Sequence, residues 1–269
     1  MYTKYLIIAL FFILNLSSLH SQTTIGVTGL LHMPNAEMQN DGTFMFGGNF
    51  LNKKNLPSNK WWGHNTYNYF INITFFERLE ISYICTLVKG KNNGYWPKPT
   101  WGKFTNQDRH FAARIQAIKE GEWWVHMPSL VLGVNDPTTA SQKDGTYYDK
   151  VSKTGNGYFN KWYIAITKNF NIHYGKLGVH AAYLYNERLD YPLNGIAFGV
   201  NFHPNFHKNL NIIAEYDAKT INVGAIYSIW ADHFNFLLEL QDGKYISCGL
   251  VYKVNLKGGN RWKSKILDY

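Results

Sequence analysis

The sequence predicts an all-β protein, an antiparallel transmembrane (outer-membrane) β-barrel of about 12 strands that follows a cleaved signal peptide. Three observations support this prediction. Apolar and polar side chains alternate in most segments between Phe44 and Leu256, the apolar face is rich in aromatic residues, and an export signal precedes the pattern. A soluble β-sandwich also has alternating strands. Here the apolar face is broad and occurs on nearly every segment, which fits a sheet closed in a bilayer around water.

The expected strands are bounded by turn residues, and most have the roughly 9–11 residues that a tilted membrane-crossing strand needs. The last one shows the pattern best, with Ile246, Cys248, Leu250, Tyr252, Val254 and Leu256 on its apolar side. The ranges are 43–51, 66–76, 78–88, 108–119, 122–134, 158–169, 173–186, 193–203, 208–218, 220–229, 233–241 and 244–256.

The N-terminus has the features of a secretory signal. Lys4 supplies the positive charge, residues 6–16 form an apolar run interrupted only by Asn15, and small serines follow. The run is shorter than the roughly 20 residues of a transmembrane helix, so we favour a cleaved signal over an uncleaved anchor. The predicted organisation is a signal peptide at 1–22, an N-terminal plug or periplasmic segment at 23–42, a barrel at 43–257 and a C-terminal tail at 258–269.

The composition is basic and aromatic. The formal net charge is +9, the pI is about 9.3, and Phe, Trp and Tyr make up 17% of the chain. A basic exported surface suits anionic lipid head groups or acidic glycans, and nothing in the sequence calls for nucleic acid. The mean hydropathy of −0.29 does not exclude a barrel, because alternation hides apolar content. Cys85 and Cys248 fall on apolar strand faces; a disulfide stays open, but we favour small lipid-facing side chains.

The connections differ at the two ends of the predicted sheet. Short turns fall at one end, whereas long loops at 52–65, 89–107 and 135–157 fall at the other. Long external loops with short periplasmic turns are typical of outer-membrane barrels in Gram-negative envelopes. Trp61, Trp62, Tyr95, Trp96 and Trp101 lie in these loops. They suit contact with sugar or lipopolysaccharide, and anchoring at the membrane interface is an equal alternative.

Alternation places charged side chains of both signs in the lumen. The lumen-facing candidates are Glu80, Arg114, His180, Glu215, Asp217, Glu239 and Lys253. Because unpaired buried charge is unfavourable, we expect Arg114 and Lys253 to pair with the lumen carboxylates. A selective polar passage and a filled, non-conducting lattice are both open. We favour the filled lattice, because wide channels need about 16 strands.

Catalytic and metal-binding patterns are poor. The strand serines lack a nucleophile elbow around them, and the histidines form no metal pair at helical spacing. We therefore expect no enzymatic activity, no cofactor and no metal. A lipid hydrolase would need a serine and a histidine on neighbouring strands, and we regard this as a minor alternative.

Three short blocks resemble the YjbH-like family of outer-membrane proteins, in the family's order. The first is Gly29-Leu30-Leu31-His32-Met33-Pro34-Asn35-Ala36 followed by Asp41-Gly42; the second runs from Glu122 through Pro128 and Gly133 to Asp136; the third is Glu215-Tyr216-Asp217 followed by Asn222-Val223-Gly224. Many family members are longer and have a second barrel-like half. The resemblance implies a barrel linked to exopolysaccharide or capsule secretion, without enzymatic activity.

The functional hypothesis is an outer-membrane barrel that assists export or surface assembly of exopolysaccharide, as a passage or as a partner of the machinery. The alternative is a non-conducting structural barrel in a protein-secretion or outer-membrane assembly complex. The expected partners are outer-membrane lipid and lipopolysaccharide, with anionic polysaccharide and secretion-machinery proteins as further candidates.

Overall fold

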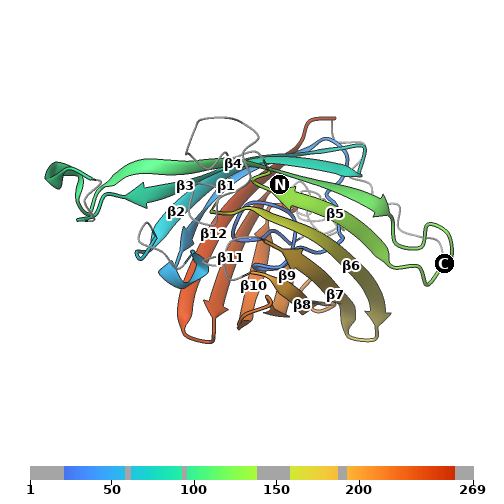
Figure 1. Cartoon of the computed structure of the whole chain (residues 1–269). Helices are drawn as coiled ribbons and strands as arrows, with labels where there is room; N and C mark the ends of the chain where they lie inside the picture. The colour runs from blue at the N-terminus through green and yellow to red at the C-terminus, as the bar shows by residue number, and fades with distance from the viewer. Residues whose placement is uncertain (1–20, 58–61, 93–95, 138–157, 187–192, 258–269) are drawn as a thin grey trace, which may run out of the picture.

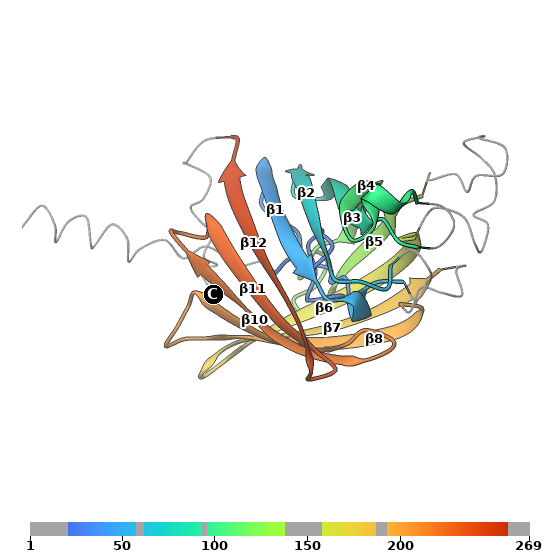
Figure 2. The ribbon, with the colours of Figure 1, turned by 90° about the vertical axis from the view of Figure 1, so that its left-hand side faces the viewer.

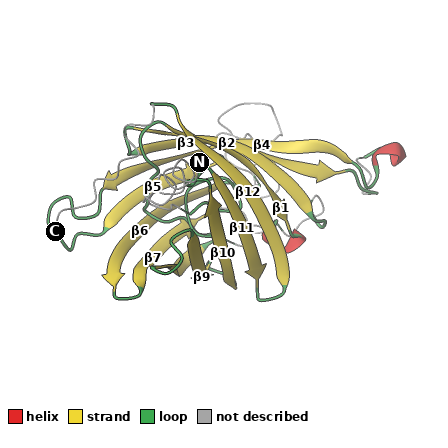
Figure 3. Ribbon diagram, turned by 180° about the vertical axis from the view of Figure 1, so that it is seen from behind, coloured by secondary structure: helices red, strands yellow, loops and turns green. Residues whose placement is uncertain are grey.

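A computed structural model describes residues 21–57, 62–92, 96–137, 158–186 and 193–257. These residues form a closed barrel of twelve strands, which confirms the predicted fold class. The strands are β1 (Thr43–Leu51), β2 (Thr66–Phe75), β3 (Leu79–Lys89), β4 (Phe104–Ile118), β5 (Ser129–Asn135), β6 (Lys161–Ile172), β7 (Gly175–Tyr185), β8 (Gly195–Pro204), β9 (Leu210–Tyr216), β10 (Ile221–Ile229), β11 (Phe234–Gln241) and β12 (Tyr245–Asn255). Two short 3₁₀ turns, η1 (Lys53–Asn55) and η2 (Lys98–Thr100), are red in Figure 3.

Each strand pairs antiparallel with its neighbour in sequence, and β1 pairs with β12 to close the ring (Figure 1). The closing register runs from Thr43 opposite Asn255 to Phe50 opposite Cys248. Closure leaves no unpaired strand edge in the wall, which is the condition for a sheet to lie in hydrocarbon.

Burial alternates along the strands and separates an apolar exterior from a polar interior. On β11, Phe236, Leu238 and Leu240 are exposed, whereas Asn235 and Glu239 are buried. The same alternation holds on β2 and β6. Large exposed side chains on the outer face are therefore aliphatic or aromatic, the face that a bilayer would cover. No helix within the described ranges is long and apolar enough to cross a membrane.

The short turns carry aromatic side chains at their tips, one feature that the sequence analysis missed. Phe76, Trp123, Tyr174, Phe206 and Trp230 are 60–86% exposed, and each lies in a different turn at the same end of the barrel. Such rings suit the membrane–water interface. By contrast, the long-loop residue Trp62 is fully buried against Phe159, so it contacts neither sugar nor lipid head groups. Trp61 and Tyr95 lie outside the described residues.

The largest error in a predicted strand boundary is at the start of β5. Residues 122–128 form a turn before β5, closed by hydrogen bonds from the Gly121 amide to the Met127 carbonyl and from the Met127 amide to the Trp124 carbonyl. Pro128 lacks an N–H for a strand ladder, and the Glu122 carboxylate holds the turn through Arg78. The alternating pattern here comes from an exposed Trp-Trp-Val tip and not from a strand.

Both cysteines are free, Cys85 on β3 and Cys248 on β12, which excludes the disulfide left open above. The predicted tail at 258–269 and residues 1–20 of the predicted signal peptide lie outside the described residues. Ser21 and Gln22, the last two residues of that predicted signal, are buried with the segment that follows them.

We expect Leu238→Arg to destabilise the folded barrel in lipid vesicles by roughly 2–4 kcal/mol, because its side chain is exposed at the middle of β11 on the apolar exterior. Denaturant unfolding followed by tryptophan fluorescence measures the loss. Leu256→Arg is the matched control, because Leu256 is exposed just past the end of β12, where the expected loss is about 0–1 kcal/mol. Equal losses in the two variants would contradict a bilayer around the strands.

Candidate functional site

The N-terminal segment fills the lumen. Residues 21–39, hereafter the plug, are buried throughout, and Figure 2 shows them as the dark blue coil inside the ring of strands. Isolated bridges join Gln22 to Thr28 and Gly29 to Pro34, so the plug is a pair of tight loops and not a strand of the wall. Of the two placements considered for residues 23–42, plug or periplasmic segment, the structure has most of the segment inside the barrel.

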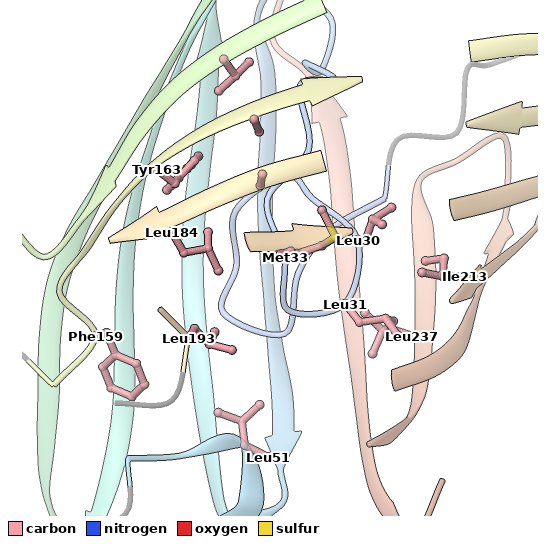
Figure 4. Close-up of a cluster of buried hydrophobic side chains, with 14 of the residues drawn as sticks. Leu30, Leu31, Met33, Leu51, Phe159, Tyr163, Leu184, Leu193, Ile213 and Leu237 are labelled. Carbon is pink, nitrogen blue, oxygen red and sulfur yellow. The ribbon is translucent and has the colours of Figure 1, made fainter. Parts of the chain in front are cut away.

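Apolar side chains of the plug pack against inward-facing positions of the wall. Figure 4 shows Leu30, Leu31 and Met33 of the plug near Ile213 and Leu237 of the wall, in one buried cluster. Burying a side chain of this kind contributes roughly 1.5–3 kcal/mol. The plug is thus attached by a small hydrophobic core in the middle of a polar lumen.

Two glycines of the wall make room for these side chains. A Cβ atom at Gly199 would lie 2.3 Å from Leu30 Cδ1, and one at Gly224 would lie 3.0 Å from Leu31 Cδ2. A side chain at Gly199 would clash, because real Cβ contacts do not come this close. Gly224 belongs to the third sequence block, and its packing against Leu31 gives that block a physical role.

Glu215 on β9 binds the backbone of the plug. Its carboxylate accepts hydrogen bonds from the amides of Leu31 at 2.9 Å, His32 at 2.7 Å and Met33 at 3.3 Å. The Asn222 side-chain amide donates to the same carboxylate at 3.2 Å. Three successive amides around one anionic group form an anion-binding nest in which the anion belongs to the protein itself.

His32 lies between two carboxylates of the wall. Its Nδ1 is 2.8 Å from Asp217 Oδ2, and its Nε2 is 2.7 Å from Glu239 Oε1. Burial alone would lower the pKa of His32, but the adjacent charges of Glu239 and Asp217 outweigh burial and raise it well above 6.5. This shift favours the protonated, imidazolium form of the buried His32 ring.

Asp217, just past β9, is the matching anion. Burial raises the pKa of its carboxyl, but the imidazolium of His32 and donors from Thr220 and Asn222 outweigh burial and lower it to about 2. The Lys219 and Thr220 amides donate to Oδ1 at 3.0 and 2.8 Å, which fixes the turn between β9 and β10. Asp217 therefore joins the outer turn to the plug.

Arg114 and Glu80 hold the plug on the opposite side of the lumen. Arg114 donates to the backbone carbonyls of Thr28, Asn35 and Glu37. Glu80 accepts from the Thr28 amide at 2.8 Å and from its hydroxyl at 2.6 Å. The expected pairing of Arg114 with a lumen carboxylate is wrong: Glu80 is its cross-strand neighbour, yet both side chains bind the plug.

The other two candidates lie at the edges of this network. Lys253 pairs with Asp232 at 3.3 Å, not with a carboxylate among the predicted lumen partners, which corrects its expected partner as well. His180 contacts the plug through Thr167: its Nδ1 is 2.8 Å from the Thr167 hydroxyl, which accepts from the Ala36 amide at 2.8 Å.

Polar wall residues that the sequence analysis did not single out complete the attachment. Asn49 and Asn68 both donate to the Thr24 carbonyl, at 2.9 and 2.7 Å. Gln116 donates to the Ala36 carbonyl at 2.7 Å. All three occupy inward positions, so alternation could have found them, but nothing in the pattern distinguishes a plug-binding amide from one that faces water.

The remaining residues of the three blocks have local structural roles. Gly42 adopts φ +75° at the entry to β1, and the space above Gly133 is taken by the Tyr163 ring. Pro34 and Gly29 form a bridge within the plug, whereas Tyr216 faces outward and is 42% exposed. The blocks therefore include much of the plug, the residues Glu215 and Asp217 that bind it, and two turns.

A cavity between plug and wall shows how little space remains. It is bounded by residues that include Thr24, His32, Asp217 and Gln241 and has a volume of about 10 Å³. This is room for about one water molecule. The arrangement can hold a segment of chain in place, and it offers no room here for a sugar ring.

The family model described as exopolysaccharide biosynthesis protein YbjH matches residues 21–197. The chain belongs to the YjbH family. This confirms the resemblance, and the match covers the plug and the first two sequence blocks of this YjbH chain; the third block lies beyond it. No curated protein matches the chain.

Two solved structures are similar to this YjbH barrel in part. The Salmonella typhi outer membrane phospholipase dimer with bound calcium shares 11% identity, over 79% of this chain and 89% of that one, with a TM-score of 0.34. The Escherichia coli outer membrane phospholipase A shares 12% identity, over 81% and 97% of the two chains, with a TM-score of 0.33. Similarity at this level says nothing about the chemistry of this YjbH chain.

We expect Glu215→Gln to lower the free energy of unfolding by at least about 2 kcal/mol, because one neutral carbonyl replaces the anion that three amides share. Urea unfolding in detergent micelles measures the change. Glu122→Gln is the control: that carboxylate bonds Arg78 at an exposed turn, and its loss is expected to leave the free energy of unfolding nearly unchanged. A Glu215 variant as stable as this control would contradict the clamp.

The His32 pair makes stability depend on pH. The pKa of His32 is raised from 6.5, so its contribution to the free energy of unfolding is complete below pH 6.5 and is lost as pH rises through the raised pKa. The pKa of Asp217 is lowered from 3.8, so its contribution is complete above pH 3.8 and is lost as pH falls towards 2. The difference in unfolding free energy between the native chain and His32→Gln should therefore be largest between pH 3.8 and 6.5 and shrink at alkaline pH. His173→Gln, in the exposed turn before β7, should show no such trend. A constant difference for His32→Gln would mean that His32 is neutral.

Proposed function

We propose that this chain is an outer-membrane barrel that assists export or surface assembly of exopolysaccharide as a non-enzymatic partner of the machinery. The family membership supports the link to exopolysaccharide. The apolar exterior of the closed barrel and the aromatic tips of its short turns support a place in the outer membrane, with the long loops outside.

The observation that favours a partner over a passage is the plug. A glycan can cross only if residues 21–39 leave the lumen, and that would break the contacts of Glu215, Arg114 and Glu80 together. Each such contact involves a charged group, and hydrogen bonds to charged groups contribute about 1.5–3 kcal/mol each. A barrel sealed in this way is suited to present surfaces to other components and to lipopolysaccharide or anionic glycan.

A structural subunit of a protein-secretion or outer-membrane assembly complex is the second candidate. The turn before β5 favours it, because Trp123, Trp124 and Val125 protrude together and are 55–76% exposed. The other short turns lack such a run of three. This tip offers an apolar contact surface at the end of the barrel away from the long loops.

Two measurements distinguish a sealed partner from a passage. We expect the native barrel to show no stable conductance in planar lipid bilayers, and we expect the double variant Glu215→Ala, Arg114→Ala to conduct, because both sides of the plug are then released. Steady conductance through the native barrel would favour a passage.

Deletion of the gene should reduce exopolysaccharide at the cell surface, and the native chain should restore it. His173→Gln is a suitable control for complementation, since His173 lies in an exposed turn away from both the plug and the Trp123 tip. Unchanged polysaccharide in the deletion strain, with loss of partner proteins from the membrane instead, would support the second candidate.

A further inference from the structure

A second cluster of titratable side chains lies outside the plug network, at the long-loop end of the wall. Asp108 and His110 are two positions apart on β4 and share its inner face. Asp136 follows β5 with φ +50°, and its amide donates to the Phe111 carbonyl at 2.7 Å. That hydrogen bond and the β4–β5 register, with Ala112 opposite Asn135, bring the three side chains together.

The three groups are close and withdrawn from solvent. One ligand atom from each of Asp108, His110 and Asp136 lies within 4.8 Å of the other two. His110 Nδ1 is 3.1 Å from Asp108 Oδ1, and these two side chains are 0% and 7% exposed. Phe159 stacks on the His110 ring at 5.0 Å between centroids, with an angle of 24° between the ring planes. The ring thus shields the cluster from water.

A second, independent observation concerns the hydrogen bonds of this region. The Nε2 atom of His110 is buried without a hydrogen-bond partner, and so is the side-chain oxygen of Asn135, the residue before Asp136. Buried polar atoms are nearly always satisfied, and an orphan costs about 1–3 kcal/mol. Among the described residues, the ion-pair partner of Asp108 is His110 and no lysine or arginine.

We propose that Asp108, His110 and Asp136 bind a divalent transition-metal ion of the Zn²⁺ or Mn²⁺ class. Imidazole together with carboxylates suits these ions, whereas Ca²⁺ prefers oxygen ligands alone. The ion would connect β4 to the segment that leaves β5. This proposal departs from the expectation of no metal, which rested on the absence of a histidine pair at helical spacing; these ligands lie on two elements and follow no motif spacing.

The His32 cluster is a contrasting case. His32, Glu215 and Asp217 also place ligand atoms within 4.8 Å of one another. There, both Glu215 oxygens accept backbone amides, and both Asp217 oxygens accept donors. Both ring nitrogens of His32 face carboxylates. Because the carboxylate oxygens of Glu215 and Asp217 already accept hydrogen bonds from the chain, that cluster is not assigned a metal.

Calorimetric titration of the chelator-treated, detergent-solubilised full chain with Zn²⁺, Mn²⁺ or Ca²⁺ alone tests the proposal. We expect one Zn²⁺ or Mn²⁺ per chain, bound more tightly than Ca²⁺, and a higher thermal unfolding temperature in its presence. His110→Gln and Asp108→Asn should each weaken binding by about tenfold or more. Both variants replace one ligand and keep a similar shape.

His173→Gln is the matched control, since it removes an exposed histidine from a turn at the other end of the barrel and should leave binding unchanged. Far-UV circular dichroism and heat-modifiable gel mobility check that each variant folds. Absence of one-to-one binding by the native chain would overturn the proposal, as would tighter binding of Ca²⁺. Loss of binding in the His173 variant alone would show an adventitious surface site, which also overturns it.

Discussion

The backbone of residues 21–39 lies inside the barrel without a neighbouring strand, and its buried N–H and C=O groups need partners. The wall supplies many of them: Glu215 accepts from three amides, Arg114 donates to carbonyls, and Asn49 and Asn68 share another carbonyl. This constraint explains the polar lumen. The charged groups of the lumen are placed to hydrogen-bond the backbone N–H and C=O groups of the plug. For this reason Glu80 and Arg114 lie side by side without forming an ion pair.

The same constraint relates the family's sequence blocks to one another. The first block is the plug itself, and the third, with Glu215, Asp217 and Gly224, is a part of the wall that receives it. Residues almost two hundred positions apart thereby form one unit. In this member of the YjbH family, the unit fills the interior of the barrel and leaves its outer surfaces available.

Alternation was sufficient to predict the fold. A period of two fixes which side chains face lipid, and most strand limits follow from it to within a few residues. The alternation pattern failed at residues 122–128, where the exposed Trp123 and Trp124 of a turn resemble the outward-facing residues of a strand. The alternation pattern also could not identify the hydrogen-bond partners of the inward side chains. A side chain that binds backbone atoms has no partner residue type that could be recognised in the sequence. The predicted pairing of Arg114 was wrong for this reason, whereas Lys253 does pair with a carboxylate, but with Asp232, which was not among the predicted partners. The Asp136 cluster needed the register of β4 and β5, which no local spacing reveals.

The closing of the ring between β1 and β12 has a consequence for assembly. The plug lies immediately before β1, and its side chains interlock with Gly199 and Gly224 on strands that are made much later. This interlocking favours an order of assembly in which the plug is in place before the ring closes. We expect the hairpins to assemble around the plug and the β1–β12 pair to form last, because β12 is the last strand of the chain. The plug would thus act as a template for the barrel that encloses it.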